Sequence, residues 1–141
     1  PEGMNRRIVL DTNVLVAAAY APASASRRIV AACLASHLVA VASPAILREY
    51  EHILARAVRV DDYRDSLREL LEKLQIVEPS ETPRLVPEDR DDDKFPAAAV
   101  AGGAGWIITN DRHLLDLDPY GAIRIVPSGG FAKLVWGESS D

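Results

Sequence analysis

The sequence contains very little cysteine and histidine. Cys33 is the only cysteine among the 141 residues. It excludes a disulfide framework and a cysteine-based zinc site within one chain, and it fits a reducing compartment. The histidines are His37, His52 and His113, and their spacing is not that of metal ligands.

Basic charge and long apolar runs are also missing. There are 16 Lys and Arg against 21 Asp and Glu, and the net charge of −5 argues against a protein that coats DNA non-specifically. Residues 29–47 carry no formal charge, but polar residues and Pro44 interrupt them, so we interpret this stretch as helix, turn, strand and helix rather than as a membrane span. No secretory signal follows the N-terminus, and the expected location is the cytoplasm.

The length and composition fit one globular domain. Hydrophobic residues make up 48% and charged residues 26%, and a chain of this length can bury a core without covalent staples. We expect the domain to cover residues 4–136, followed by a flexible tail at 137–141. Pro1, Glu2 and Gly3 are expected to be an added remnant ahead of a natural start at Met4.

Short β-branched runs alternate with helical patterns along the chain. Strands are predicted at 7–10, 38–42, 75–77, 106–109 and 122–126. Helices are predicted at 27–35, 44–58, 61–74, 93–101 and 112–117, with a terminal helical turn at 131–136. Residues 79–92 are predicted to be mostly loop, with a brief strand near 85–86. This order is typical of an α/β sandwich with a mainly parallel sheet, whose sites lie at the carboxyl ends of the strands.

Four acidic residues occupy places that matter in such a fold. Asp11 ends the first strand, Asp111 follows the strand at 106–109, Glu49 lies in the helix after the second strand, and Asp93 begins a helix. Carboxylates brought together repel each other, and a hard cation such as Mg²⁺ or Mn²⁺ relieves the repulsion. Each residue also has an ordinary explanation as a cap or a solvated charge, and spacing alone does not separate Glu49 from Glu51.

Four segments carry a family resemblance. Residues 9–16 (VLDTNVLV), 43–50 (SPAILREY), 91–99 (DDDKFPAAA) and 107–115 (IITNDRHLL) resemble, in this order, the motifs of PIN-domain proteins. The likeness extends over residues 7–126 and is greatest to the VapC-like toxins of bacterial toxin–antitoxin pairs.

The resemblance implies a three-layer α/β/α fold and a Mg²⁺- or Mn²⁺-dependent ribonuclease. It assigns metal binding and catalysis to the positions of Asp11, Glu49, Asp93 and Asp111, and it selects Glu49 over Glu51. It assigns supporting roles to Thr12, Asn13 and Thr109, and we expect Asp116, one helical turn beyond Asp111, to support them from outside. The expected reaction is phosphodiester hydrolysis by a metal-activated water.

Two residues depart from the family pattern. Pro96 stands early in the third motif, where its missing N–H is tolerable only within the first helical turn. Asn110 stands where many relatives have glycine, and we expect it to keep the turn by taking the left-handed conformation.

The sequence defines the substrate and the protein partners less closely than the site. RNA is expected to enter over cations that flank the motifs, namely Arg27, Arg28, Arg48, Lys94 and Arg112. The resemblance also implies a homodimer and an antitoxin partner. The apolar stripe of Leu67, Leu70, Leu71 and Leu74 could serve such contacts, although we interpret it as core.

Three functions are alternatives to a ribonuclease. A haloacid-dehalogenase-like phosphatase also has an Asp after its first strand, but it needs a second Asp where this chain has Asn13. A receiver domain needs a Lys directly after its last strand, and the strand end at Val126 and Pro127 lacks it. The third alternative is a protein of the same fold that no longer cuts RNA and only binds a partner.

Overall fold

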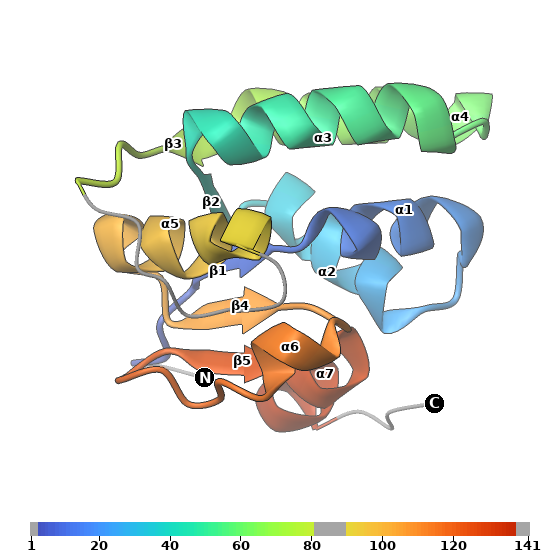
Figure 1. The fold of residues 1–141 in the computed structure, drawn as a ribbon. Coiled ribbons are helices and arrows are strands. Elements are labelled where there is room, and N and C mark those ends of the chain that lie inside the picture. Colours follow the sequence, from blue (N-terminus) through green and yellow to red (C-terminus); the bar gives the residue numbers. More distant parts are fainter. Residues whose placement is uncertain (1–2, 81–89, 138–141) are drawn as a thin grey trace.

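The protein is built on one parallel sheet. The computed structural model describes residues 3–80 and 90–137. The strands are β1 (Arg7–Leu10), β2 (Val39–Ala42), β3 (Gln75–Ile76), β4 (Trp106–Ile108) and β5 (Arg124–Val126). Their spatial order is β3-β2-β1-β4-β5, with every neighbouring pair parallel (Figure 1). β1 is therefore central, and Ile8, Val9 and Leu10 are fully buried.

Helices cover both faces of this sheet. They are α1 (Thr12–Tyr20), α2 (Ala25–Leu34), α3 (Pro44–Ala57), α4 (Asp61–Lys73), α5 (Lys94–Gly102), α6 (Arg112–Leu115) and α7 (Ser128–Trp136), with a 3-10 turn at Arg90–Asp93. In Figure 1, α5 lies in front of the sheet, where it contacts β1, β2 and β4, and α2 and α7 lie together behind it. The predicted three-layer α/β/α fold is confirmed.

Local sequence signals account for several helix ends. The Ser43 hydroxyl accepts a hydrogen bond from the Ile46 N–H, and Pro44 follows as the first residue of α3. Ser24 caps α2 through the Arg27 N–H. Gly103 ends α5 with a φ of +65°, in the left-handed region that glycine tolerates.

The predicted elements agree with the observed ones apart from small shifts and one omission. The helix α1 was not predicted, and α7 begins at Ser128 rather than at Phe131. Pro96 is the third residue of α5 and so lies within the first turn, where its missing N–H is tolerated. The brief strand near 85–86, residues 1–2 and the tail at 138–141 lie outside the described residues.

Two expectations about surfaces and turns also have an outcome. Leu67 and Leu70 are buried, as expected for core, while Leu71 and Leu74 are partly buried against it. Asn110 does not take the left-handed conformation. Among the described residues, Ser36 is the only non-glycine residue with a positive φ. The turn after β4 thus keeps ordinary backbone angles, and that expectation was wrong. No helix in the described ranges is long and apolar enough to cross a membrane.

Candidate active site

Two aspartates meet at the carboxyl edge of the central strands. Asp11 directly follows β1, and its backbone N–H donates to the Ile108 carbonyl at the end of β4 over 2.9 Å. Its side chain caps α1 by accepting from the Asn13 N–H at 3.2 Å. Asp111 follows β4 and caps α6 in the same way, through the His113 N–H at 2.8 Å. Parallel pairing of β1 with β4 therefore brings both predicted residues to the same edge.

The Thr109 hydroxyl connects these two aspartates. It donates to Asp11 Oδ2 at 2.6 Å and accepts from the Asp111 backbone N–H at 2.9 Å. Thr109 is fully buried and Asp11 is only 7% exposed. Thr109 thus orients one carboxylate and fixes the backbone that carries the other.

The pKa of Asp11 shows the electrostatic character of this edge of the sheet. Burial raises it above the ordinary value, and the hydrogen bonds from Thr109 and the Asn13 N–H offset only part of the increase. The charges of Glu49 and Asp111 raise the pKa further, so both carboxylates lie close enough to Asp11 to repel it. A pocket that disfavours its own negative charge is one in which a cation is stabilised.

Glu49 is held at the pocket by α3. One carboxylate oxygen accepts from the Thr12 hydroxyl, and the other forms an ion pair with Lys94 Nζ at 2.8 Å. The next residue, Tyr50, is fully buried, and its hydroxyl donates to the Leu10 carbonyl at the end of β1. Tyr50 therefore fastens α3 to the strand that ends at Asp11.

Lys94 lies inside the acidic cluster. Its ammonium contacts Glu49 Oε1 at 2.8 Å and Asp91 Oδ2 at 2.7 Å, and its side chain is only 12% exposed. Burial lowers the pKa of Lys94, but the bonds to Asp91 and Glu49 outweigh burial and raise it overall. Asp93, just before it, is 2% exposed and lies at the N-terminus of α5 as predicted, without capping that helix.

The other expected site residues are less closely associated with the carboxylates of Asp11, Glu49, Asp93 and Asp111. Arg27 is engaged internally: its guanidinium donates to the Ala18 and Ala19 carbonyls at 2.6 and 3.2 Å and lies 3.8 Å from the centre of the Tyr63 ring. Among the described residues, no contact joins Asp116 to the four carboxylates. The side chains of Arg48, Arg112, Asn13 and Asp116 are exposed, and Arg28 is half-buried.

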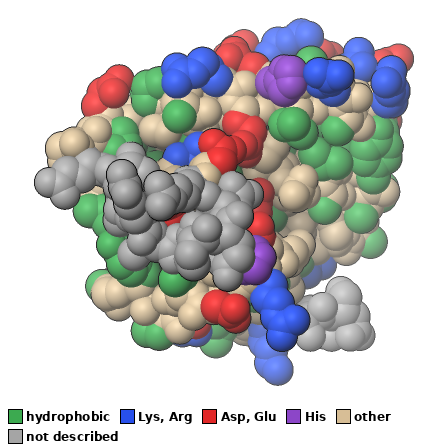
Figure 2. Space-filling view, in the orientation of Figure 1, with side chains coloured by type: hydrophobic (Ala, Val, Ile, Leu, Met, Phe, Trp, Pro, Cys, Tyr) green, Lys and Arg blue, Asp and Glu red, His purple; other side chains and the backbone are tan. Residues whose placement is uncertain are grey.

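The donor set has the chemistry that Mg²⁺ and Mn²⁺ prefer, since it consists of carboxylate oxygens. Figure 2 shows acidic side chains gathered near the middle of one face. Within residues 3–80 and 90–137, however, no three Asp, Glu, His or Cys side chains form an arrangement ready to hold a metal ion. The carboxylate oxygens of Asp11, Glu49 and Asp111 are turned toward hydroxyls, N–H groups and Lys94 instead. The residues fit a divalent ion, and binding it requires some of these partners to be exchanged.

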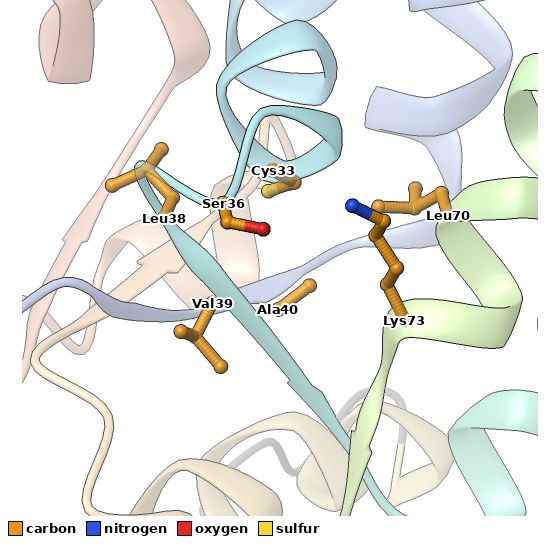
Figure 3. A pocket seen from close by; sticks show the side chains of 7 residues that line it. All are labelled: Cys33, Ser36, Leu38, Val39, Ala40, Leu70 and Lys73. Carbon is orange, nitrogen blue, oxygen red and sulfur yellow. The ribbon is translucent and has the colours of Figure 1, made fainter.

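A cavity elsewhere does not belong to this site. A half-open cavity of about 180 Å³ lies near the amino-terminal end of β2, lined by Cys33, Ser36, Leu38 and Lys73 among others (Figure 3). The Lys73 ammonium donates to the Leu34 carbonyl there, and burial raises the pKa of the Cys33 thiol to about 12. With an un-ionised thiol and no carboxylate, the cavity has none of the chemistry of the opposite edge.

Comparison with known proteins identifies the class. The family model of the PIN domain matches residues 7–113, so the chain belongs to the PIN domain family, whose members are generally nucleases. None of the curated proteins is detectably similar to this chain.

Two solved structures share the fold. One is the crystal structure of VapBC2 from Rickettsia felis bound to a DNA fragment from their promoter, with a TM-score of 0.57, 16% identity and coverage of 84% of this chain and 96% of that one. The other is PAE2754 from Pyrobaculum aerophilum, with a TM-score of 0.56, 15% identity and coverage of 94% and 90%. At this identity the likeness concerns the fold alone.

Proposed function

We propose that this protein is a Mg²⁺- or Mn²⁺-dependent ribonuclease and the toxin of a toxin–antitoxin pair. The observation that carries the proposal is that Asp11 and Asp111 follow neighbouring parallel strands at one edge of the sheet, where the charges of Asp111 and of Glu49 on α3 act on the buried Asp11. Burial chiefly, and the charges of Glu49 and Asp111 in addition, raise the pKa of Asp11, and a divalent cation would relieve both effects. Membership of the PIN domain family supports nuclease chemistry at this edge.

The chain's own residues have defined tasks in this proposal. Asp11, Glu49, Asp93 and Asp111 would hold the ion. A bound Mg²⁺ or Mn²⁺ supplies an activated water and neutralises charge on the phosphate. Thr109 keeps Asp11 aimed into the pocket, and Thr12 does the same for Glu49. The buried position of Asp11 strengthens its attraction to an ion, because charges interact more strongly away from water.

RNA would approach this edge over exposed cations. Arg48 and Arg112 flank Glu49 and Asp111 in the sequence, and both are exposed. Arg27 is engaged by backbone carbonyls and Tyr63, so its contribution to RNA binding would require breaking those contacts. The net charge of −5 also means that bound divalent ions favour the approach of an anionic substrate.

An antitoxin and a second copy of the chain are the proposed protein partners. The structural neighbour from Rickettsia felis is a VapBC complex, which supports an antitoxin partner. Large apolar side chains are exposed and available for such contacts, namely Tyr20, Ile76, Val100, Leu134 and Trp136. We place the protein in the cytoplasm, where both RNA and such a partner would be found.

A binding module without nuclease activity is the second candidate. Lys94 already supplies a cation to Glu49, and no three acidic side chains of the described ranges are arranged for a metal ion. Such a protein would keep the acidic edge folded by internal pairing alone.

One experiment separates the two. Mixed-sequence single-stranded RNA is incubated with the protein plus Mg²⁺ or Mn²⁺, with and without EDTA, beside Asp11→Asn. The control is Glu51→Gln, because Glu51 is exposed on the same helix as Glu49. We expect metal-dependent cleavage that Asp11→Asn reduces by at least about 100-fold, as for loss of a catalytic electrostatic contact, and that Glu51→Gln leaves intact. Unchanged cleavage in Asp11→Asn would sink the proposed site, and metal-independent partner binding without cleavage would favour the binding module.

A further inference from the structure

The Lys94 ammonium forms an ion pair with the carboxylate of Glu49, which the proposed metal site needs. It is 2.8 Å from Glu49 Oε1, while Thr12 donates to the other oxygen, so both oxygens of Glu49 are engaged. We propose that Lys94 is a positioning residue that holds Glu49 in the metal-free protein and competes with the divalent ion for it, thereby lowering metal affinity. This inference rests on the proposed function, because it assumes that the ion binds at this edge.

The contact differs from an ordinary surface ion pair. The side chains of Lys94 and Glu49 are 12% and 26% exposed. In the pair between Arg124 and Asp118, by comparison, the arginine is 46% exposed. A pair with little access to water is screened less by solvent and salt, so its attraction is stronger. Lys94 therefore has a substantial hold on Glu49.

The backbone gives Lys94 little freedom to move away. It is the first residue of α5, directly after the buried Asp93 and directly before Phe95, which is 1% exposed. The ammonium also contacts Asp91 through both a side-chain oxygen and the backbone carbonyl, at 2.7 and 3.0 Å. When an ion enters, the ammonium thus stays near it even after releasing Glu49.

Electrostatics gives the sign of the effect. A protonated lysine has three donors and no lone pair, so it repels a metal ion and cannot ligate it. Removing its charge makes the pocket more negative by one unit and frees one oxygen of Glu49. Both changes favour the ion. If Lys94 served mainly to orient Glu49 for the ion, removing it would weaken binding instead.

The test measures metal binding directly rather than cleavage. Mn²⁺ is titrated calorimetrically into the metal-free full-length chain, its Lys94→Met variant and a matched Arg112→Met variant. Arg112 is an exposed cation beside Asp111, so its replacement removes the same charge without touching Glu49. We expect Lys94→Met to tighten Mn²⁺ binding by about tenfold, the order of one strong charge interaction at intermediate dielectric, and Arg112→Met by less than about twofold. An equal change in both variants would reduce the effect to net charge, and weaker binding in Lys94→Met would overturn the proposal.

Two further variants separate this inference from the proposed function. Lys94→Arg keeps the charge and should leave Mn²⁺ affinity within about threefold of the parent, since the charge interaction persists. Asp11→Asn should abolish or strongly weaken Mn²⁺ binding if the ion occupies the proposed site. If the parent binds Mn²⁺ and Asp11→Asn loses it, an unchanged Lys94→Met refutes the role of Lys94 alone. If the parent binds no Mn²⁺, the metal site and the role of Lys94 fall together. Circular dichroism of each variant verifies that the fold is intact.

Discussion

The two sides of the acidic edge balance their charge in different ways. On the buried side, formed by Asp11, Thr109 and Tyr50, the carboxylate is held by neutral donors and is 7% exposed. On the ionic side, formed by Glu49, Thr12 and Lys94, an ammonium neutralises the carboxylate and water reaches part of it. Neutral donors only partly offset the burial of Asp11, whereas Lys94 supplies a full opposite charge to Glu49.

This difference explains how the acidic edge could be stable without metal and still favour a divalent cation. The buried side stores unfavourable charge, and an entering ion relieves it. The ionic side already contains a cation, and an entering ion must replace it. Without metal, the charge of the edge is therefore balanced mainly on the ionic side, whereas the driving force for the proposed metal binding would come mainly from the buried side.

Removing the support of the buried side should have the largest effect. Tyr50→Ala takes away a fully buried aromatic ring and its hydrogen bond to the Leu10 carbonyl. We expect a loss of about 3–5 kcal/mol in the free energy of unfolding, as for other large aromatic truncations in a core. Tyr20→Ala is the control, because Tyr20 is 50% exposed, and it should cost about 1 kcal/mol or less. Urea unfolding measures both, and similar losses in the two variants would contradict the comparison.

Replacing one threonine by valine on each side tests the difference in stability between the two sides. Thr109→Val removes the donor to Asp11 and the acceptor for the Asp111 N–H in a fully buried place, and should cost about 1–3 kcal/mol. Thr12→Val removes one donor to Glu49, which water and Lys94 still reach, and should cost about 1 kcal/mol or less. Thermal unfolding of both variants in EDTA measures the difference. A larger loss in Thr12→Val would reverse the assignment of the two sides.

The smallest expected effect has the opposite sign. The folded-state pKa of Asp11 is raised, so this residue favours folding when protonated, and that contribution is lost as the pH rises through the folded-state pKa. Without metal, Asp11→Asn should therefore be more stable than the parent at pH 7, by about 0.5–2 kcal/mol, the range typical of relieving active-site strain.

The dependence on pH checks this explanation. As the pH is lowered toward and below the folded-state pKa of Asp11, the parent becomes protonated there and the advantage of Asp11→Asn should disappear. Asp116→Asn is the control, because Asp116 is exposed and its substitution should leave the pH profile unchanged. Denaturant unfolding in EDTA across the acidic range provides the measurement. An advantage that does not depend on pH would remove Asp11 ionisation as its cause.

The parts of the site that follow directly from strand ends were predictable. Asp11 and Asp111 each come directly after a short apolar strand, and parallel pairing brought them together. The supporting role of Thr109 was implied by the family resemblance rather than by the strand end, and in the structure its hydroxyl donates to Asp11. The mainly parallel sheet was predicted from the alternating strand and helix patterns, whereas the three layers were implied by the family resemblance.

The parts that depend on packing between distant elements were not predictable. Lys94 reads as one more flanking cation until α5 is placed against α3, which turns its ammonium toward Glu49. The hydroxyl of Tyr50 finds the Leu10 carbonyl only in the folded chain. The helix α1 was missed because its residues, VLVAAAY after the cap, are apolar on nearly every side, and no amphipathic period marks them. The Asp11 cap was the one signal that could have revealed it.

The central place of β1 has a consequence for how the protein is made. β1 (Arg7–Leu10) is synthesised well before its partner β4 (Trp106–Ile108), so the edge that carries Asp11 is completed only after β4 has emerged from the ribosome. Asp111 comes later still. For an enzyme proposed to destroy RNA, this order of synthesis would keep the acidic edge unassembled on the nascent chain until β4 and Asp111 have emerged.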